Sequence, residues 1–399
     1  MGGIDERDGR APAHHSAITK GPPITLLDYY RAKGISPVGQ DISDLAGHFA
    51  RRAALYRTLG LIPAAFRGSR VLEVAPGSGH NSLYIANLRP AEFHLVEPNP
   101  TAIATIKQLY ADFSVAHTPP ILHETMLETF SPAQQFDIVL CENWLGGTPA
   151  ERGLMAKLGL MVAPHGVLVL TSVSPIGLVP NLLRRVLLGR ILRDEDFEAR
   201  TALGVEALSS HLATLAAMTR SHRDWIQDNM LNPAYFAVMI SPLEACTAVG
   251  SGFAIYNSSP SFRTDWRWYK AMTGDEARFT ELYSEDYWRI CHNWLDYRHL
   301  AGPRDPAANR ALEGLAAQLP AEVQRLEAGE SGAADAILQL VADIEANIQD
   351  LPATTREALR EFREVFSSSN LTAAKVAGMA AYRPWFGREV QYLSLQRAG

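Results

Sequence analysis

Residues 71–79, VLEVAPGSG, constrain the fold of this chain more than any other stretch. They begin with a short apolar run, interrupted only by Glu73, of the kind found in buried strands. A proline and two glycines then supply a tight bend and leave the backbone bare, so that a ligand can come close. Residues 81–88 predict a helix, because apolar side chains recur at helical spacing and Asn81 or Ser82 can cap its first turn. A strand, a glycine turn and a helix N-terminus in this order predict a nucleotide pocket.

Two carboxylates indicate which ligand this pocket takes. Glu73 lies within the end of the first strand, where it would repel a pyrophosphate and hold an ammonium group. Glu97 ends a second apolar strand, 93–97, and could accept hydrogen bonds from two ribose hydroxyls. The sequence therefore favours a positively charged cofactor.

At this point the chain resembles the class I S-adenosylmethionine (SAM) dependent methyltransferases, whose first motif reads E/D-x-G-x-G-x-G. The chain matches this motif with Glu73, Gly77 and Gly79, and carries Ala75 in place of the first glycine. The resemblance covers about residues 45–175, and the final strand by inference. It implies SAM as the cofactor and a doubly wound, seven-stranded Rossmann-like α/β sheet whose last strand is antiparallel.

Predicted strands and helices alternate after the glycine turn. They are expected at 93–97, 101–112, 121–124, 136–141, 153–161 and 167–172. Alternation of this kind is typical of a parallel, doubly wound sheet, which binds its ligands at the carboxyl ends of the strands.

The resemblance assigns cofactor-binding residues to four of these strand ends. Glu124 would accept the adenine amino group, with Thr125 and Met126 beside the ring, and residues 141–144 would lie near the sulfonium. The candidates at the strand ends are Glu73, Ala75, Pro76, Gly77, Ser78, Gly79, His80, Glu97, Pro98, Asn99, Glu124, Thr125, Met126, Cys141, Glu142 and Asn143.

Helices ahead of the first motif close over the cofactor in this family. Residues 45–59 read as an amphipathic helix, and a shorter one is expected around ITLLDYYRAKGI, from residue 24. Tyr29, Arg51 or Arg52 could therefore contact the methionine carboxylate. The alternative is that the arginines form a solvated helix face.

We expect two large helical insertions that leave the sheet at its cofactor edge and form a lid around the methyl acceptor. In chain order the expected parts are a disordered lead (1–23), N-terminal cofactor-covering helices (24–66), a SAM-binding core (67–175), a first helical insertion (176–250), a sixth strand (251–260), a second helical insertion (261–383) and a final antiparallel strand (384–399).

Each insertion contains one segment with two interpretations. Residues 178–193 are apolar and basic together, too short and too charged to span a bilayer, so they either contact a membrane surface or pack within the protein. Helices in 305–366 carry an apolar stripe that serves either as a seam within the monomer or as a homodimer contact. The stripe consists of Ile337, Val341, Ile344, Ile348 and Leu351.

Composition argues against several classes of partner. The 399 residues carry a net charge of −6 with no Lys/Arg run longer than two, which disfavours nucleic acid. No run of 18 apolar residues predicts a transmembrane segment. The three cysteines, Cys141, Cys246 and Cys291, are far apart and odd in number, which fits free thiols in a reducing cytoplasm.

Methyl transfer from a sulfonium is an in-line displacement, so it requires alignment of the acceptor and exclusion of water more than acid–base chemistry. A hydroxyl acceptor would benefit from a general base, for which His222, Asp224, His292 and Glu142 are candidates. Each of them could instead hydrogen-bond to a neighbouring backbone or indole group. No closely spaced set of ligands predicts a metal site; His222 with Asp224 and Asp228 comes nearest.

The many aromatic residues between 266 and 299 indicate the class of methyl acceptor. They suit a small organic molecule, a sugar or a lipid-linked intermediate, which would be methylated on oxygen or nitrogen. An NAD-dependent oxidoreductase is the first alternative, although Glu73 and Ser82, which stands where the third glycine of that motif belongs, argue against it. A non-catalytic module that binds SAM or a partner protein through 305–366 is the second.

Overall fold

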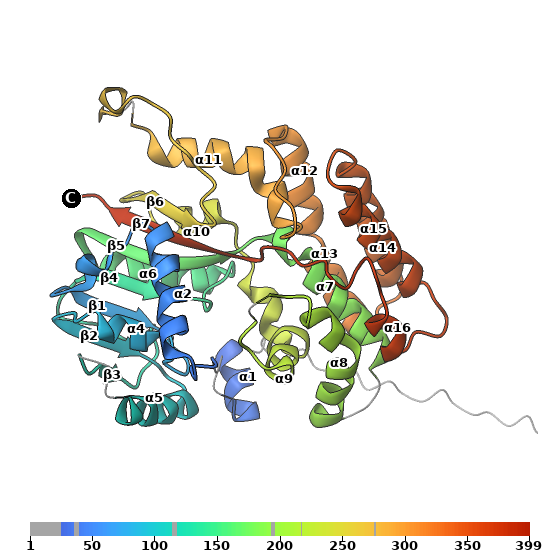
Figure 1. Cartoon of the computed structure of the whole chain (residues 1–399), viewed down its shortest axis with the longest axis horizontal. Helices are drawn as coiled ribbons and strands as arrows, with labels where there is room; N and C mark the ends of the chain where they lie inside the picture. Colours follow the sequence, from blue (N-terminus) through green and yellow to red (C-terminus); the bar gives the residue numbers. More distant parts are fainter. Residues whose placement is uncertain (1–24, 36–39, 114–117, 193–195, 217, 275–276) are drawn as a thin grey trace, which may run out of the picture.

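The computed structural model describes residues 25–35, 40–113, 118–192, 196–216, 218–274 and 277–399. These residues form a seven-stranded sheet flanked by helices, and a helical body that lies beside one end of the sheet (Figure 1). The predicted disordered lead at 1–23 lies outside the described residues.

The strand order is β3-β2-β1-β4-β5-β7-β6. Strands β1 to β5 pair in parallel, whereas β7 is antiparallel to both of its neighbours, β5 and β6. The predicted methyltransferase sheet with an antiparallel last strand is confirmed. The strands are β1 (Arg70–Val74), β2 (Glu92–Val96), β3 (Ile121–His123), β4 (Phe136–Cys141), β5 (Val162–Val173), β6 (Phe253–Ser259) and β7 (Val390–Arg397).

Helices cover both faces of the sheet because successive strand side chains point to opposite sides. Val71 belongs to a core shared with α2, α4 and α5, and Leu72 belongs to a core shared with α6 and α10. The helices associated with the sheet are α1 (Leu26–Lys33), α2 (Leu45–Thr58), α3 (Pro63–Phe66), α4 (Ser82–Asn87), α5 (Pro100–Asp112), α6 (Pro149–Met161) and α10 (Pro242–Val249).

Side-chain caps fix where several of these helices begin. Asn99 accepts a hydrogen bond from the Thr101 amide at 3.1 Å, and Pro100 occupies the first turn of α5, where no amide donor is needed. Thr148 and Glu151 form a reciprocal capping box at the start of α6. Because β2 leads directly into Asn99, this cap also sets the position of the residues at the end of β2.

The helical body has a single hydrophobic core built from both predicted insertions. Leu187 of the first insertion shares this core with Ile344, Phe362 and Trp385 of the second. Its elements are α7 (Pro175–Ile191), α8 (Phe197–Leu212), α9 (His222–Trp225), the π-helix η1 (Ile226–Met230), η2 (Pro233–Val238), η5 (Cys291–Trp294), α11 (Phe279–Ile290), α12 (Pro306–Ala316), α13 (Leu319–Glu327), α14 (Ala333–Asn347), α15 (Ala353–Phe366) and α16 (Ala373–Ala377). A short 3₁₀ turn, η3 (Tyr269–Ala271), lies between β6 and α11.

Helix α7 passes through the centre of this body, so of the two interpretations of this segment the structure supports packing within the protein over a membrane-surface contact for residues 178–192. Arg184 is fully buried and donates a hydrogen bond to the Trp385 carbonyl oxygen at 2.7 Å, and its guanidinium lies 3.6 Å from the centre of the Phe386 ring. Arg185 is also buried and pairs with Glu327 at 2.6 Å. The basic side chains thus find their partners inside the protein. Within the described ranges, no helix is long and apolar enough to cross a bilayer.

The apolar stripe from Ile337 to Leu351 is also covered within the monomer. Ile337, Val341 and Ile344 have no exposed surface, and Leu351 is 8% exposed. The stripe is therefore a seam of the helical body, and a homodimer would have to use another surface of residues 305–366.

Two of the connections between the sheet and the helical body, β5 to α7 and the segment that enters β7, lie at the carboxyl ends of the parallel strands. Helix α7 starts two residues after β5 ends, and the Ser174 amide donates to the Glu389 carbonyl oxygen at 3.1 Å, just before β7 begins. Strand β7 starts beside the helical body and runs away from it toward the C-terminus (Figure 1). Because β5 is antiparallel to β7, the carboxyl end of β5 lies next to the helical body. The helical body is thus placed at the edge of the sheet where ligands of such folds bind.

Candidate active site

The glycine turn connects β1 to α4 with three left-handed residues. The φ angles are +57° at Ala75, +58° at Gly77 and +77° at Gly79. A Cβ at Gly79 would lie 2.8 Å from Cγ1 of Ile106, so glycine is required there for space as well as for conformation. Ala75 adopts a left-handed backbone although it is not a glycine, at the steric cost that a Cβ brings in this region.

Glu73 lies buried beneath this turn, with 5% of its surface exposed. Its Oε2 has no hydrogen-bond partner among the described residues. Burial raises the pKa of Glu73 to about 7 and the charge of Glu142 adds to the rise, while Ser82 and Arg52 act in the opposite direction. A buried carboxylate oxygen is costly when the nearby Ser82 hydroxyl is its only available donor, so this position suits a further donor from a ligand.

Glu97, at the end of β2, ties the glycine turn to the neighbouring strand. Its Oε2 accepts the Gly77 amide at 3.1 Å and its Oε1 accepts the Asn99 amide at 2.8 Å. Only 4% of Glu97 is exposed. Because a carboxylate offers about four lone-pair sites, both oxygens can accept further hydrogen bonds.

Glu142, at the end of β4, is held by a buried ion pair with helix α2. Arg52 Nη2 lies 2.6 Å from Glu142 Oε1, and both side chains are 8% exposed. The Tyr56 hydroxyl donates to the same oxygen at 3.0 Å and accepts from Arg52 at 2.7 Å. Two carboxylates and one guanidinium therefore meet at this edge of the sheet. Since the guanidinium is bonded to Glu142, it compensates the charge of Glu73 only in part.

Residues 46–198 match the family model for a methyltransferase domain. The matched range contains the glycine turn and strands β1 to β5 of the sheet. The chain carries a class I methyltransferase domain. The cofactor of this family is S-adenosyl-L-methionine.

Solved methyltransferase structures show more distant similarity. The N-methyltransferase NodS from Bradyrhizobium japonicum WM9, in complex with S-adenosyl-L-homocysteine (SAH), is 21% identical, with a TM-score of 0.30 over 37% of this chain and 74% of NodS. The CcbJ methyltransferase from Streptomyces caelestis is 21% identical, with a TM-score of 0.27 over 35% of this chain and 58% of CcbJ. The glycopeptide N-methyltransferase MtfA is 18% identical, with a TM-score of 0.27 over 35% of this chain and 63% of MtfA. No curated protein sequence matches the chain.

Helix α2 turns a polar stripe toward the carboxyl ends of the strands. His48, Arg52 and Tyr56, spaced four residues apart, are its buried positions. His48 Nε2 lies 3.2 Å from the His80 carbonyl oxygen in the glycine turn, and Ser78 Oγ hydrogen-bonds to the His80 ring. The solvated-face interpretation thus holds for the exposed Arg51 and fails for Arg52. The spacing of the apolar residues predicted this helix, but it did not predict that Tyr56 contacts Glu142. The four-residue spacing of His48, Arg52 and Tyr56, which places them on one face of the helix, could have indicated this contact.

The ends of β4, β5 and β7 form a second wall beside Glu142. Asn143 adopts a left-handed φ of +57°, and its amide donates to Thr171 Oγ1 at 2.7 Å. Its side chain lies 3.4 Å from the hydroxyl of Tyr392, on β7. Sequence reasoning missed Tyr392 because only the assembled sheet brings β7 next to β5. Cys141 is buried, and burial raises the pKa of its thiol.

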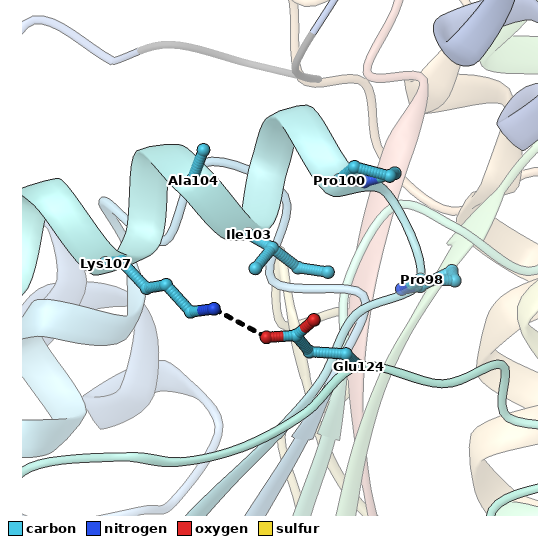
Figure 2. A pocket seen from close by; sticks show the side chains of 6 residues that line it. All are labelled: Pro98, Pro100, Ile103, Ala104, Lys107 and Glu124. Carbon is cyan, nitrogen blue, oxygen red and sulfur yellow. Dashed lines mark hydrogen bonds and ion pairs between the residues drawn. The ribbon is translucent and has the colours of Figure 1, made fainter.

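The candidates at the end of β3, together with Pro98, form a partly exposed rim. Pro98 and Glu124 line a pocket of ≈ 390 Å³ beside α5, together with Pro100, Ile103, Ala104 and Lys107 (Figure 2). Glu124 is held by Lys107 at 2.6 Å, and both side chains are more than half exposed. Thr125 Oγ1 hydrogen-bonds to Thr129 at 2.9 Å, and Met126 is 38% exposed.

Helix α1 links this rim to the helical body. Arg31 donates to the Pro98 carbonyl oxygen at 2.7 Å, and the Tyr30 hydroxyl donates to Asp228 at 2.6 Å in the π-helix. Tyr29 is buried, and its hydroxyl donates to the Gln227 carbonyl oxygen at 2.8 Å. The Tyr29 hydroxyl is therefore committed to the helical body in this arrangement.

Of the four catalytic candidates, only Glu142 joins the cluster around Glu73. His222 and Asp224 lie on α9 in the helical body, and Asp224 is exposed. His292 is 2% exposed, with ring nitrogens 3.2 Å from Asn309 Nδ2 and 3.3 Å from Asn293 Nδ2. Across the described part of the chain, no group of three or more His, Cys, Asp or Glu residues is arranged to hold a metal ion.

Proposed function

We propose that this protein transfers the methyl group of SAM to a small organic, sugar or lipid-linked acceptor, on oxygen or nitrogen. The observation that supports this most strongly is the buried Glu73 oxygen that lacks a donor, beneath the glycine turn of a class I methyltransferase sheet. When bound, SAM supplies a methyl group activated by a sulfonium. The remaining steps depend on the residues of this chain.

The proposed cofactor contacts follow from the charges around the glycine turn. Glu73 would accept the ammonium group of the methionine moiety, because its Oε2 is buried and Arg52, which is bonded to Glu142, compensates its charge only in part. Glu97 would accept the ribose hydroxyls with the lone pairs that the Gly77 and Asn99 amides leave free. Pro98 and Glu124 would lie beside the adenine. In this arrangement Arg52 orients Glu142, and it is not the partner of the methionine carboxylate.

Alignment and exclusion of water are the main tasks left to the protein. We propose that the helical body acts as the lid, because the connections of β5 to α7 and of the body to β7 lie at the carboxyl edge of the sheet. Glu142 is the preferred proton acceptor for the methylated group: it adjoins Glu73, and its Oε2 is buried and without a partner among the described residues. His222 and Asp224 remain secondary candidates on the helical body. His292 is better explained as part of the packing of that body, because it is buried between two asparagines.

The affinity for SAH should depend on pH. Since the pKa of Glu73 in the free protein is about 7, the carboxyl is largely protonated below that pH and cannot attract an ammonium. We expect the affinity to rise by up to about tenfold per pH unit between roughly pH 5.5 and 7 and to level off above. Calorimetric titration with SAH at a series of pH values measures this. A Glu73→Gln variant should lose the slope, and an unchanged slope in that variant would assign the dependence to another group.

The proposed activity can be tested without knowing the acceptor. The full chain is incubated with methyl-labelled SAM and a metabolite extract, and labelled products are identified by mass spectrometry. We expect a labelled small molecule together with SAH, and neither when Glu73→Gln replaces the wild type at low SAM concentration. Parallel titration with NADH tests the oxidoreductase alternative. Tight binding of NADH together with no binding of SAH would reject the proposal.

A further inference from the structure

A protruding loop presents three large aromatic side chains to solvent. Trp266 is 91% exposed, and Trp268 and Tyr269 are each 66% exposed. We call residues 266–272 the aromatic loop. It lies between β6 and α11, in the segment that extends beyond the rest of the molecule at the upper left of Figure 1. Tryptophan is highly buried on average, so two exposed tryptophans and a tyrosine within four residues indicate a surface that is covered by something else.

Ion pairs hold the base of the aromatic loop in place. Arg263 pairs with Asp286 of α11 at 2.6 Å and with Asp265 at 3.1 Å. Arg267 pairs with the same Asp265 at 2.6 Å and donates to the Ala277 carbonyl oxygen at 2.9 Å. The aromatic side chains are therefore presented by a fixed base, and they do not fold back onto the protein.

The charge of the loop differs from that of the whole chain. The aromatic loop contains Arg267, which pairs with Asp265, and Lys270; it has no acidic residue of its own, although Asp275 and Glu276 follow it in the sequence and the chain carries a net charge of −6. Lys270 Nζ lies 5.2 Å from the ring centre of Trp268 and 5.9 Å from that of Tyr269. Within the described part of the chain, Lys270 forms no ion pair. A cation next to exposed aromatic rings is complementary to phosphate headgroups above an apolar layer.

We propose that the aromatic loop attaches this protein to the interface of a phospholipid bilayer. Indole and phenol rings have an apolar body and a polar edge, and they concentrate where hydrocarbon meets headgroups. The Lys270 ammonium would reach the phosphates while the rings of Trp266, Trp268 and Tyr269 enter the upper acyl region. This contact replaces the one considered for 178–193, where the burial of α7 supports packing within the protein.

Shape favours a bilayer over a protein partner. A stable protein interface covers about 800 Å² on each side and has a packed centre surrounded by a polar rim. The aromatic loop is a narrow, convex tip with three exposed rings, which does not provide such a surface. A bilayer needs no complementary shape and can take up a tip of this size.

Sedimentation of the full chain with lipid vesicles tests the proposal. The vesicles contain phosphatidylcholine alone or phosphatidylcholine with phosphatidylglycerol. We expect the wild type to sediment with both, more strongly with the anionic lipid, and Trp266→Ala/Trp268→Ala to bind at least about tenfold more weakly. Lys270→Glu should mainly remove the preference for anionic lipid. The matched control is Leu160→Ala, which removes a side chain that is 71% exposed on α6 and should bind like the wild type.

Three results would overturn the proposal. The wild type could fail to sediment with either vesicle, or the double variant could sediment like the wild type. In the third result, size-exclusion chromatography shows the wild type as a dimer and the double variant as a monomer, and the wild type does not bind vesicles. This result would assign the loop to contacts between copies of the chain. SAH binding is measured on every variant and should not change. Failure of vesicle binding with intact SAH binding therefore leaves the proposed methyl transfer unaffected.

Discussion

The Glu73→Gln variant is expected to bind SAH about 100-fold more weakly than the wild type at pH 8. At that pH the carboxylate of the wild type is ionised, because its pKa is about 7. The amide that replaces it has the same size but no charge, so a charge-assisted hydrogen bond to the ammonium is lost in a buried setting. Losses of this kind cost about 2–3 kcal/mol, and each 1.4 kcal/mol corresponds to a factor of ten. Calorimetry with SAH isolates this effect, since SAH carries the ammonium without the sulfonium.

A matched control for this variant is Glu128→Gln, which neutralises an exposed carboxylate in the segment between β3 and β4. Its affinity for SAH should stay within about threefold of the wild type, because exposed charges are well screened. Circular dichroism should show both variants folded. If Glu73→Gln binds SAH as tightly as Glu128→Gln does, Glu73 is not the partner of the ammonium.

The Arg52→Met variant is expected to lower the free energy of unfolding by about 3–5 kcal/mol, which is the usual cost of removing one member of a buried ion pair. Arg52 and Glu142 are each 8% exposed, and without the guanidinium Glu142 would retain only the hydrogen bond from Tyr56. A buried carboxylate without a cation must either remain charged at high cost or take up a proton. Urea unfolding of the full chain measures the change.

Two further variants separate the ion pair from the packing of α2. Arg52→Met combined with Glu142→Met should recover most of the lost stability, because an apolar pair can replace a buried ion pair. Arg51→Met, one position earlier on the exposed face of α2, should change stability by less than about 0.5 kcal/mol. A double variant no more stable than Arg52→Met would show that the arginine acts through packing alone.

Local patterns were sufficient to predict most of the sheet. The strands expected at 121–124, 136–141 and 167–172 begin or end within a few residues of β3, β4 and β5. Alternating hydrophobicity and turn residues act over a few positions, so they can be recognised in one sequence. The motif that contains Glu73 and Gly79 likewise lies within one strand and one turn, which is why the candidate cofactor site could be located before any contact was known.

The charged and tyrosine partners of this site could not be predicted in the same way. Arg52 and Glu142 are 90 positions apart, and both arginines at 51 and 52 fit a solvated helix face when only the spacing is considered. Tyr392 reaches Asn143 only because β7 inserts between β5 and β6. Sequence periodicity identifies a helix or a strand, but it does not identify the element that covers each face.

By itself, the sequence determined the class of the sheet, the glycine turn and the carboxylates at the strand ends, because these depend on neighbouring residues. The tertiary structure alone decided that the apolar and basic segment 178–192 is the buried centre of the helical body and that two insertions share one core. It also decided which carboxylate at the carboxyl edge of the sheet receives Arg52. These outcomes depend on packing between distant segments, where burial makes an unpaired charge costly and thereby selects the partners.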